Sequence, residues 1–164
     1  MADDLIILSE QIKQKALSLG FDICGIAKPR HLSEQEHHFR TWLEKGMNDR
    51  MAYLERDPAG RFNPGLVSPG VKSLIVTGIS YYSEKGQVGK DVPVLTRYAY
   101  GEDYHDVIIP KLRELLGFIK EKVPGAEGKA YSDTGFLHEK SWISEAGLGW
   151  QGKHSITISP QIGS

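Results

Sequence analysis

The spacing of apolar residues along the chain predicts a series of helices and strands. A helix is expected over residues 4–19, because four apolar residues fall near one helical face: Leu5, Ile12, Ala16 and Leu19. Gly20 follows where a glycine commonly ends a helix, and the apolar run 21–27 predicts a short buried strand. Further helices are expected at 33–45, 51–54, 101–122 and 138–146. Further strands are expected at 73–82, 94–100, 128–132 and 155–159.

Turn and capping residues mark the segments between these elements. Ser33 followed by Glu36 resembles a capping box at the start of the second helix. Proline and glycine at turn spacing predict an extended loop at 61–72, and the polar stretch 83–91 predicts a surface loop. Because helices and strands alternate irregularly, we expect a single α/β domain over residues 1–164, with a mixed β-sheet sandwiched by helices.

Composition narrows the class of protein. The 164 residues suit one domain, and 40% hydrophobic with 25% charged residues is ordinary for a soluble globular chain. No apolar run is long enough to span a membrane, and the acidic N-terminus does not resemble a signal peptide. The single Cys24 excludes an internal disulfide and fits a reducing cytoplasm. A net charge of −1 provides no general attraction for nucleic acid, so any RNA contact must come from a local patch.

Asp133 in the segment YSDTG has two interpretations. An aspartate before Thr-Gly commonly forms a turn by bonding its own backbone. Alternatively, an acid at the end of a strand can deliver a proton if it is partly shielded from water. The sequence predicts the strand end but not the shielding.

The segment AGLGWQGKH, residues 146–154, formally contains the glycine pattern of dinucleotide-binding loops. That reading is rejected, because such loops follow a strand and open a helix, whereas here a helix precedes and a strand follows. The glycines instead favour close approach to a bulky ligand, with Trp150 as a flat wall and Lys153 meeting an anion. A helix end followed by a turn, with Lys153 solvated, explains the pattern equally well.

The segment 97–106 gathers polar aromatic residues where a predicted strand meets a helix: Tyr98, Tyr100, Tyr104 and His105. They form either a binding cluster or simply a capped helix with half-buried tyrosines. Arg97 could bind a phosphate or pair with Glu102, and Arg61 is similarly ambiguous. The six histidines lack metal-ligand spacing, so no metal site is predicted. Serine-hydrolase and phosphate-loop motifs are also missing.

Four segments together resemble a known family, the epoxyqueuosine reductases, which are cobalamin-dependent iron–sulfur enzymes of queuosine biosynthesis in tRNA. The segments are MAYLERDPAGRFNPGLVSPGVKSLIVTGISYY, RYAYGEDYHDVIIPKLREL, YSDTG and SEAGLGWQGKHSITISPQIGS. The resemblance covers nearly the whole chain. Its specificity comes from the joint match of R-Y-A-x-G-x-D-Y-H with A-G-L-G-W-x-G-K.

The resemblance implies a cobalamin-binding domain, similar in fold to the corrinoid domains of reductive dehalogenases and distantly to nitroreductases. It implies that low-valent cobalt removes the epoxide oxygen and that Asp133 protonates that oxygen. Implied cobalamin contacts are Arg61, Arg97, Tyr98, Asp133, Gly149, Trp150, Gly152, Lys153 and Thr157. Implied partners are a tRNA with wobble epoxyqueuosine and an external electron donor. The protein itself is expected to be a monomer. Local cations for the tRNA phosphates would be Lys140, Lys153 and His154.

The family continues past the glycine that matches Gly163 into a ferredoxin-like domain with two 4Fe-4S clusters. One cysteine cannot hold such clusters, so we expect a truncated or proteolysed form that is inactive alone. Two other functions stay open: a cobalamin-binding or trafficking module without its own chemistry, and a flavin-dependent reductase.

Overall fold

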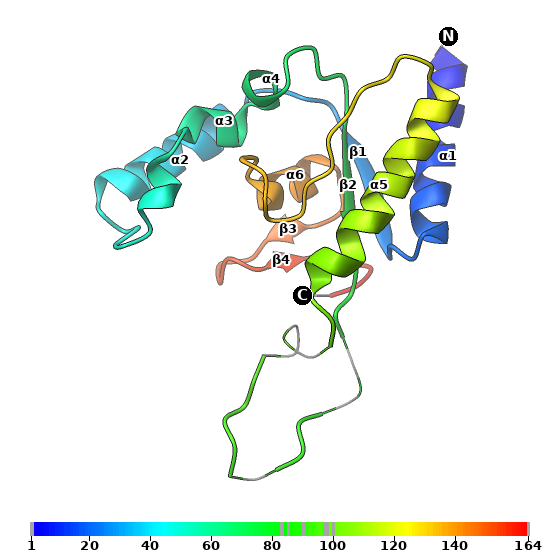
Figure 1. Ribbon diagram of the computed structural model, residues 1–164. Coiled ribbons are helices and arrows are strands. Elements are labelled where there is room, and N and C mark those ends of the chain that lie inside the picture. Colours follow the sequence, from blue (N-terminus) through cyan, green and yellow to red (C-terminus); the bar gives the residue numbers. More distant parts are fainter. Residues whose placement is uncertain are drawn as a thin grey trace. The chain divides into compact units, whose positions relative to one another are not determined.

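The computed structural model describes residues 2–82, 84, 86–89, 91–96, 99 and 101–163 (Figure 1). These residues form an α/β fold. Its elements are α1 (Ala2–Ser18), β1 (Ile23–Ala27), α2 (Ser33–Glu44), the 3₁₀ helix η1 (Ala52–Glu55), α3 (Pro58–Phe62), α4 (Pro64–Val67), β2 (Leu74–Gly78), α5 (Tyr104–Lys122), α6 (Glu139–Glu145), β3 (Trp150–Gln151) and β4 (Thr157–Ile158). The chain divides into two compact units, the first comprising Met1–Ile23 and Thr77–Ser132, and the second Cys24–Val76 and Asp133–Ser164.

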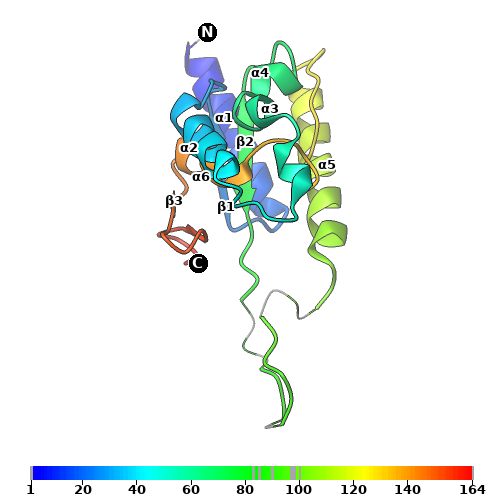
Figure 2. The same ribbon diagram turned by 90° about the vertical axis from the view of Figure 1, so that its left-hand side faces the viewer.

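In the first unit, α1 packs against α5 (Figures 1 and 2). Ile12 and Ala16 are buried on the predicted face of α1, whereas Leu5, two turns before Ile12 on the same face, is 65% exposed. Lys15 Nζ lies 2.6 Å from Glu114 Oε1 and joins the two helices. Gly20, with φ +83°, ends α1 as predicted, because a left-handed residue at this position favours glycine.

Helix α5 confirms the predicted helix. The side chain of Asp103 accepts the backbone N–H of His105 at 2.9 Å and so caps the helix. The predicted inward positions are buried or half-buried: Val107, Leu112, Leu115, Leu116 and Ile119. Among the described residues, no helix has the length and apolar content to cross a bilayer.

Of the predicted strands, one is wrong and another is not found in its described residues. Residues 128–132 form no strand, and neither do the described residues 94–96 of the predicted strand 94–100. A strand needs a partner for its backbone groups and an apolar face to bury, and Val94 is 92% exposed. Arg97, Tyr98 and Tyr100 lie outside the described residues.

The core of the second unit surrounds α3 and α6. Its buried members are Ala27, Leu32, Phe62 and Trp142, with half-buried Phe39, Leu74, Val76, Leu137 and Ala146 against them. The sequence predicted one mixed sheet. In the described part of the chain the strands instead form two separate two-stranded sheets, β1 with β2 and the antiparallel β3 with β4. Strands β3 and β4 contribute two residues each and form a small hairpin.

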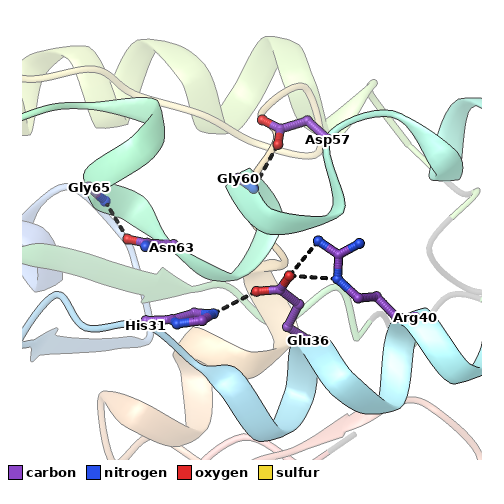
Figure 3. Close-up of polar contacts among 7 residues, drawn as sticks. All are labelled: His31, Glu36, Arg40, Asp57, Gly60, Asn63 and Gly65. Carbon is purple, nitrogen blue, oxygen red and sulfur yellow. Dashed lines mark hydrogen bonds and ion pairs between the residues drawn. The ribbon is translucent and has the colours of Figure 1, made fainter.

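The predicted loop 61–72 is partly wrong, because it overlaps α3 and contains α4. Each helix starts with a proline after a capping residue: Asp57 accepts Gly60 N–H at 2.9 Å, and Asn63 accepts Gly65 N–H at 3.1 Å (Figure 3). Proline is tolerated in the first helical turn, where its missing N–H has no helical partner. These residues therefore start helices as well as turns.

The predicted capping box is also wrong. Leu32 occupies the cap position of α2 and makes no side-chain cap hydrogen bond. The Glu36 carboxylate turns instead to His31 Nε2 at 2.6 Å and to Arg40 Nε at 2.7 Å (Figure 3). His31 and Arg40 compete successfully with a backbone N–H for this carboxylate, because hydrogen bonds to a charged group are the stronger ones.

Candidate functional site

Arg61 lies in the last turn of α3, and its side chain contacts Tyr53 and Phe39. Its Nη2 donates to the Tyr53 carbonyl at 3.0 Å, and its Cζ lies 5.8 Å from the centre of the Phe39 ring. Its Nε is buried and makes no hydrogen bond with the described residues. A buried donor without an acceptor is costly, so Arg61 is suited to receive an acceptor from a ligand.

Helix α3 is supported by α2 beneath it (Figure 3). The Leu32 N–H donates to the Phe62 carbonyl at 2.9 Å, which fixes the end of α3 beside the start of α2. Within α2, the hydrogen bond from His31 lowers the pKa of Glu36, and Arg40 lowers it further against the opposing effect of burial. The charged carboxylate therefore stabilises the support of Arg61.

Asp133 adopts a left-handed backbone conformation with φ +54°. A left-handed conformation is uncommon for any residue other than glycine, although aspartate tolerates it better than most residues do. The Asp133 N–H donates to Glu139 Oε1 at 2.9 Å. Because no strand precedes it, the predicted strand end is wrong. Asp133 is exposed, so the described residues do not supply the shielding from water that a proton donor needs.

Three consecutive residues at the start of α6 connect the predicted site segments. The backbone N–H of His138 donates to the Arg61 carbonyl at 2.8 Å. Next, Glu139 accepts the Asp133 N–H, and Lys140 Nζ donates to the Ser155 carbonyl at 2.7 Å, within the segment that joins β3 to β4. The structure thus brings Arg61, Asp133 and the β3–β4 hairpin to one support.

The sequence did not single out His138 or Glu139. The His138 ring stacks on Phe62, with centres 5.1 Å apart, and its Nδ1 lies 2.9 Å from Ser141 Oγ. Burial lowers the pKa of His138, and the positive charges of Lys140 and Arg61 lower it further, so the ring is neutral near pH 7. The only sequence signal for these residues was their place at the start of a predicted helix.

The β3–β4 hairpin carries the remaining predicted contacts. Trp150 pairs with Ile158 and is 51% exposed, so it presents a flat apolar surface. Lys153 is exposed and Thr157 is half-buried. A Cβ on Gly149 would collide with the Ile158 carbonyl oxygen, so the hairpin itself requires glycine at this position.

Gly152 differs from Gly149 in what a side chain would meet. A Cβ at Gly152 would collide with the His154 ring, a side chain that can move. Gly147, with φ +70°, follows the end of α6 as a helix-ending glycine does. The alternative of a helix end plus a turn therefore accounts for the glycines without a ligand.

Cobalamin is a large disc fringed with amides, and the residues here fit such a group chemically. Arg61 Nε and Trp142 Nε1 are buried donors without partners in the described chain. The half-exposed Trp150 ring adds apolar surface, and a two-stranded hairpin leaves backbone groups available along its outer edges. In the part of the chain that the structure describes, no three His, Cys, Asp or Glu residues gather as metal ligands.

Comparison with known proteins agrees with the resemblance. The family model "Epoxyqueuosine reductase QueG, DUF1730" matches residues 61–134. The epoxyqueuosine reductase of Cellulophaga algicola is 38% identical over 156 residues, which are 95% of this chain and 51% of that protein. This chain therefore spans about half the length of the curated relatives it matches.

Two solved structures share the fold. An epoxyqueuosine reductase crystallised with an epoxyqueuosine-modified tRNA-Tyr stem loop has a TM-score of 0.79 at 28% identity, covering 97% of this chain and 43% of that chain. The Bacillus subtilis enzyme, solved with its aspartate-bearing catalytic loop swung out of the active site, has a TM-score of 0.78 at 27% identity with the same coverage.

These relatives are oxidoreductases by name, and the α/β fold of the chain is shared with the two solved epoxyqueuosine reductases. More particularly, nearly the whole chain is similar in sequence and in fold to about half of an epoxyqueuosine reductase.

Proposed function

We propose that this chain forms the cobalamin-binding part of an epoxyqueuosine reductase, which converts the epoxide of epoxyqueuosine in tRNA to the alkene of queuosine. The observation that carries the proposal is the shared support at the start of α6, which holds Arg61, Asp133 and the hairpin together. A relative solved with the modified tRNA stem loop supports tRNA as the substrate.

The finer expectations from the sequence belong to the same proposal. Residues 1–164 would make up one cobalamin-binding domain with the fold of reductive-dehalogenase corrinoid domains. In the complete enzyme a ferredoxin-like part would hold two 4Fe-4S clusters and receive electrons from an external donor. We expect this enzyme to act as a cytoplasmic monomer.

Cobalamin would be held by Arg61 of α3 and by residues of the β3–β4 hairpin. Arg61 would offer its unpaired Nε, the Trp150 ring would contact the macrocycle, and Lys153 and Thr157 would reach its polar edge. Among the other expected contacts, Gly149 and Gly152 shape the hairpin that presents Trp150, while Arg97 and Tyr98 lie outside the described residues.

Reduction of an epoxide to an alkene consumes two electrons and two protons and releases water. Cobalamin, when bound, would supply reducing electrons to the substrate. Asp133 would donate one proton to the departing oxygen. Because this side chain is exposed, a covering ligand and nucleotide would have to shield it, and such shielding favours the neutral, proton-bearing form of a carboxyl group.

The epoxide could reach the site only if the wobble nucleotide leaves its stack. Lys153 and His154 are exposed at the hairpin and are suited to contact flanking phosphates. Lys140 has a structural role as well, because its Nζ holds the Ser155 carbonyl.

A spectroscopic titration tests the proposal. Hydroxocobalamin should change its visible spectrum on binding, while flavin mononucleotide should keep the fluorescence of the free molecule. Tight flavin binding without corrinoid binding would replace the proposal with a flavin-dependent reductase. If corrinoid binds but the complete enzyme leaves an epoxyqueuosine stem loop unreduced, the chain is a binding or trafficking module.

A further inference from the structure

We propose that Glu139 is a positioning residue for the acid of this site, holding the backbone of Asp133 so that its carboxyl group faces the reacting oxygen. The inference rests on the proposed function of Asp133 as proton donor. It starts from one contact, the 2.9 Å hydrogen bond from the Asp133 N–H to Glu139 Oε1.

The backbone of Asp133 needs such a support. Its φ of +54° lies in the left-handed region, which is unfavourable for residues with a side chain. No helix or strand contains residues 128–138, so no backbone ladder imposes this conformation. A carboxylate is a strong acceptor for a backbone N–H, and Glu139 provides one.

Glu139 is itself held at a fixed place. It is the first residue of α6, and a negative charge is favourable at a helix start. Its neighbours are both tied: the His138 N–H donates to the Arg61 carbonyl at 2.8 Å, and Lys140 Nζ donates to the Ser155 carbonyl at 2.7 Å. These hydrogen bonds fix the backbone of Asp133 relative to Arg61 and to the hairpin. Arg61 and the hairpin are the parts expected to hold the cofactor.

Two substitutions separate the acceptor from the charge. Glu139→Ala removes both, whereas Glu139→Gln keeps an acceptor oxygen at the same reach. Glu34→Gln is the matched control, because Glu34 also lies in the first turn of a helix, α2, and is exposed. A positioning role predicts that Gln restores what Ala loses, and that the control behaves like the unsubstituted protein.

The test measures hydrogen exchange of the Asp133 amide by NMR in the complete protein, together with turnover on an epoxyqueuosine stem loop. In Glu139→Ala, exchange should accelerate about fivefold or more. Turnover should fall about tenfold or more, as expected for a displaced reacting group, with hydroxocobalamin affinity within about threefold. Glu139→Gln should stay within about threefold of the unsubstituted protein in both measurements.

The inference is overturned if the Asp133 amide of the unsubstituted protein exchanges at the rate of an unprotected amide. This measurement does not depend on whether any variant folds. It is also overturned if Glu139→Ala leaves exchange unchanged, or if Glu139→Gln matches Glu139→Ala. Failure of the proposed function has a different signature. If Asp133→Asn retains turnover while Glu139 still protects the amide, the catalytic assignment falls and the backbone support stands.

Discussion

Removing the charge of Glu36 tests what stabilises α2, the helix that packs against α3 and its residue Arg61. Glu36 is 8% exposed, and its carboxylate meets His31 Nε2 at 2.6 Å and Arg40 Nη2 at 2.6 Å. Glu36→Gln keeps the size of the side chain and removes its charge. We expect the substitution to lower the free energy of unfolding, because both partners lose a charged acceptor.

The magnitude follows from the exposure of the partners. A hydrogen bond to a charged group contributes about 1.5–3 kcal/mol. The side chains of His31 and Arg40 are 48% and 47% exposed, so water replaces part of each lost contact and the contributions must be discounted. We therefore expect a loss of about 2 kcal/mol from both contacts together. For a chain of this size the midpoint of thermal unfolding would fall by about 4–8 °C.

The loss should depend on pH in one direction. The pKa of Glu36 is lowered in the folded protein, chiefly by the hydrogen bond from His31. The stabilisation is therefore present above the unfolded pKa and disappears as the pH falls through the lower folded pKa. The unfolding free energies of Glu36→Gln and the unsubstituted protein should differ by about 2 kcal/mol at pH 6 and by less at pH 3.

Urea denaturation at both pH values measures this difference, with Glu34→Gln as the control on the same helix. An exposed acid should change stability by less than about 0.5 kcal/mol. The reasoning is refuted if Glu36→Gln costs no more than the control at pH 6, or if its cost is the same at pH 3.

Two further predictions concern the other side of the site. Burial lowers the pKa of His138, so the protein should lose stability between pH 7.5 and pH 5.5 as the unfolded chain binds a proton more readily; His138→Gln should show a smaller loss in thermal unfolding over that range. Gly149→Ala should weaken hydroxocobalamin binding about tenfold or more, because its Cβ would strike the backbone of Ile158. Gly152→Ala should cost less, because the opposing group is the His154 side chain, and equal affinities of the two variants would argue against this account of the hairpin.

The regular elements of the fold could be predicted where a local pattern dictates them. Helices α1, α2, α5 and α6 follow apolar residues at helical spacing, and β1 and β2 follow short apolar runs. The failures have a common cause. Whether residues 94–96 form a strand depends on a partner elsewhere in the chain, and a β-branched run does not report that partner.

The second kind of failure lies in residues with two local roles. Asp57 with Pro58 and Asn63 with Pro64 start α3 and α4, yet the same residue types are typical of turns. The predicted capping role of Glu36 failed because His31 and Arg40 bind its carboxylate, a competition that spacing alone does not reveal.

For the site, the sequence supplied the residue types and their segments through a family resemblance. It could not supply the connections, because the hydrogen bonds of His138, Glu139 and Lys140 reach residues that are distant along the chain. These connections are the part of the site that only the three-dimensional structure provides.

The most direct test of the account is turnover of the complete enzyme carrying Asp133→Asn on an epoxyqueuosine-modified tRNA stem loop. The substitution removes the acidic proton and keeps the size of the side chain. The account predicts that turnover falls about a hundredfold or more, while hydroxocobalamin affinity stays within a few-fold. Turnover equal to that of the unsubstituted enzyme would contradict it.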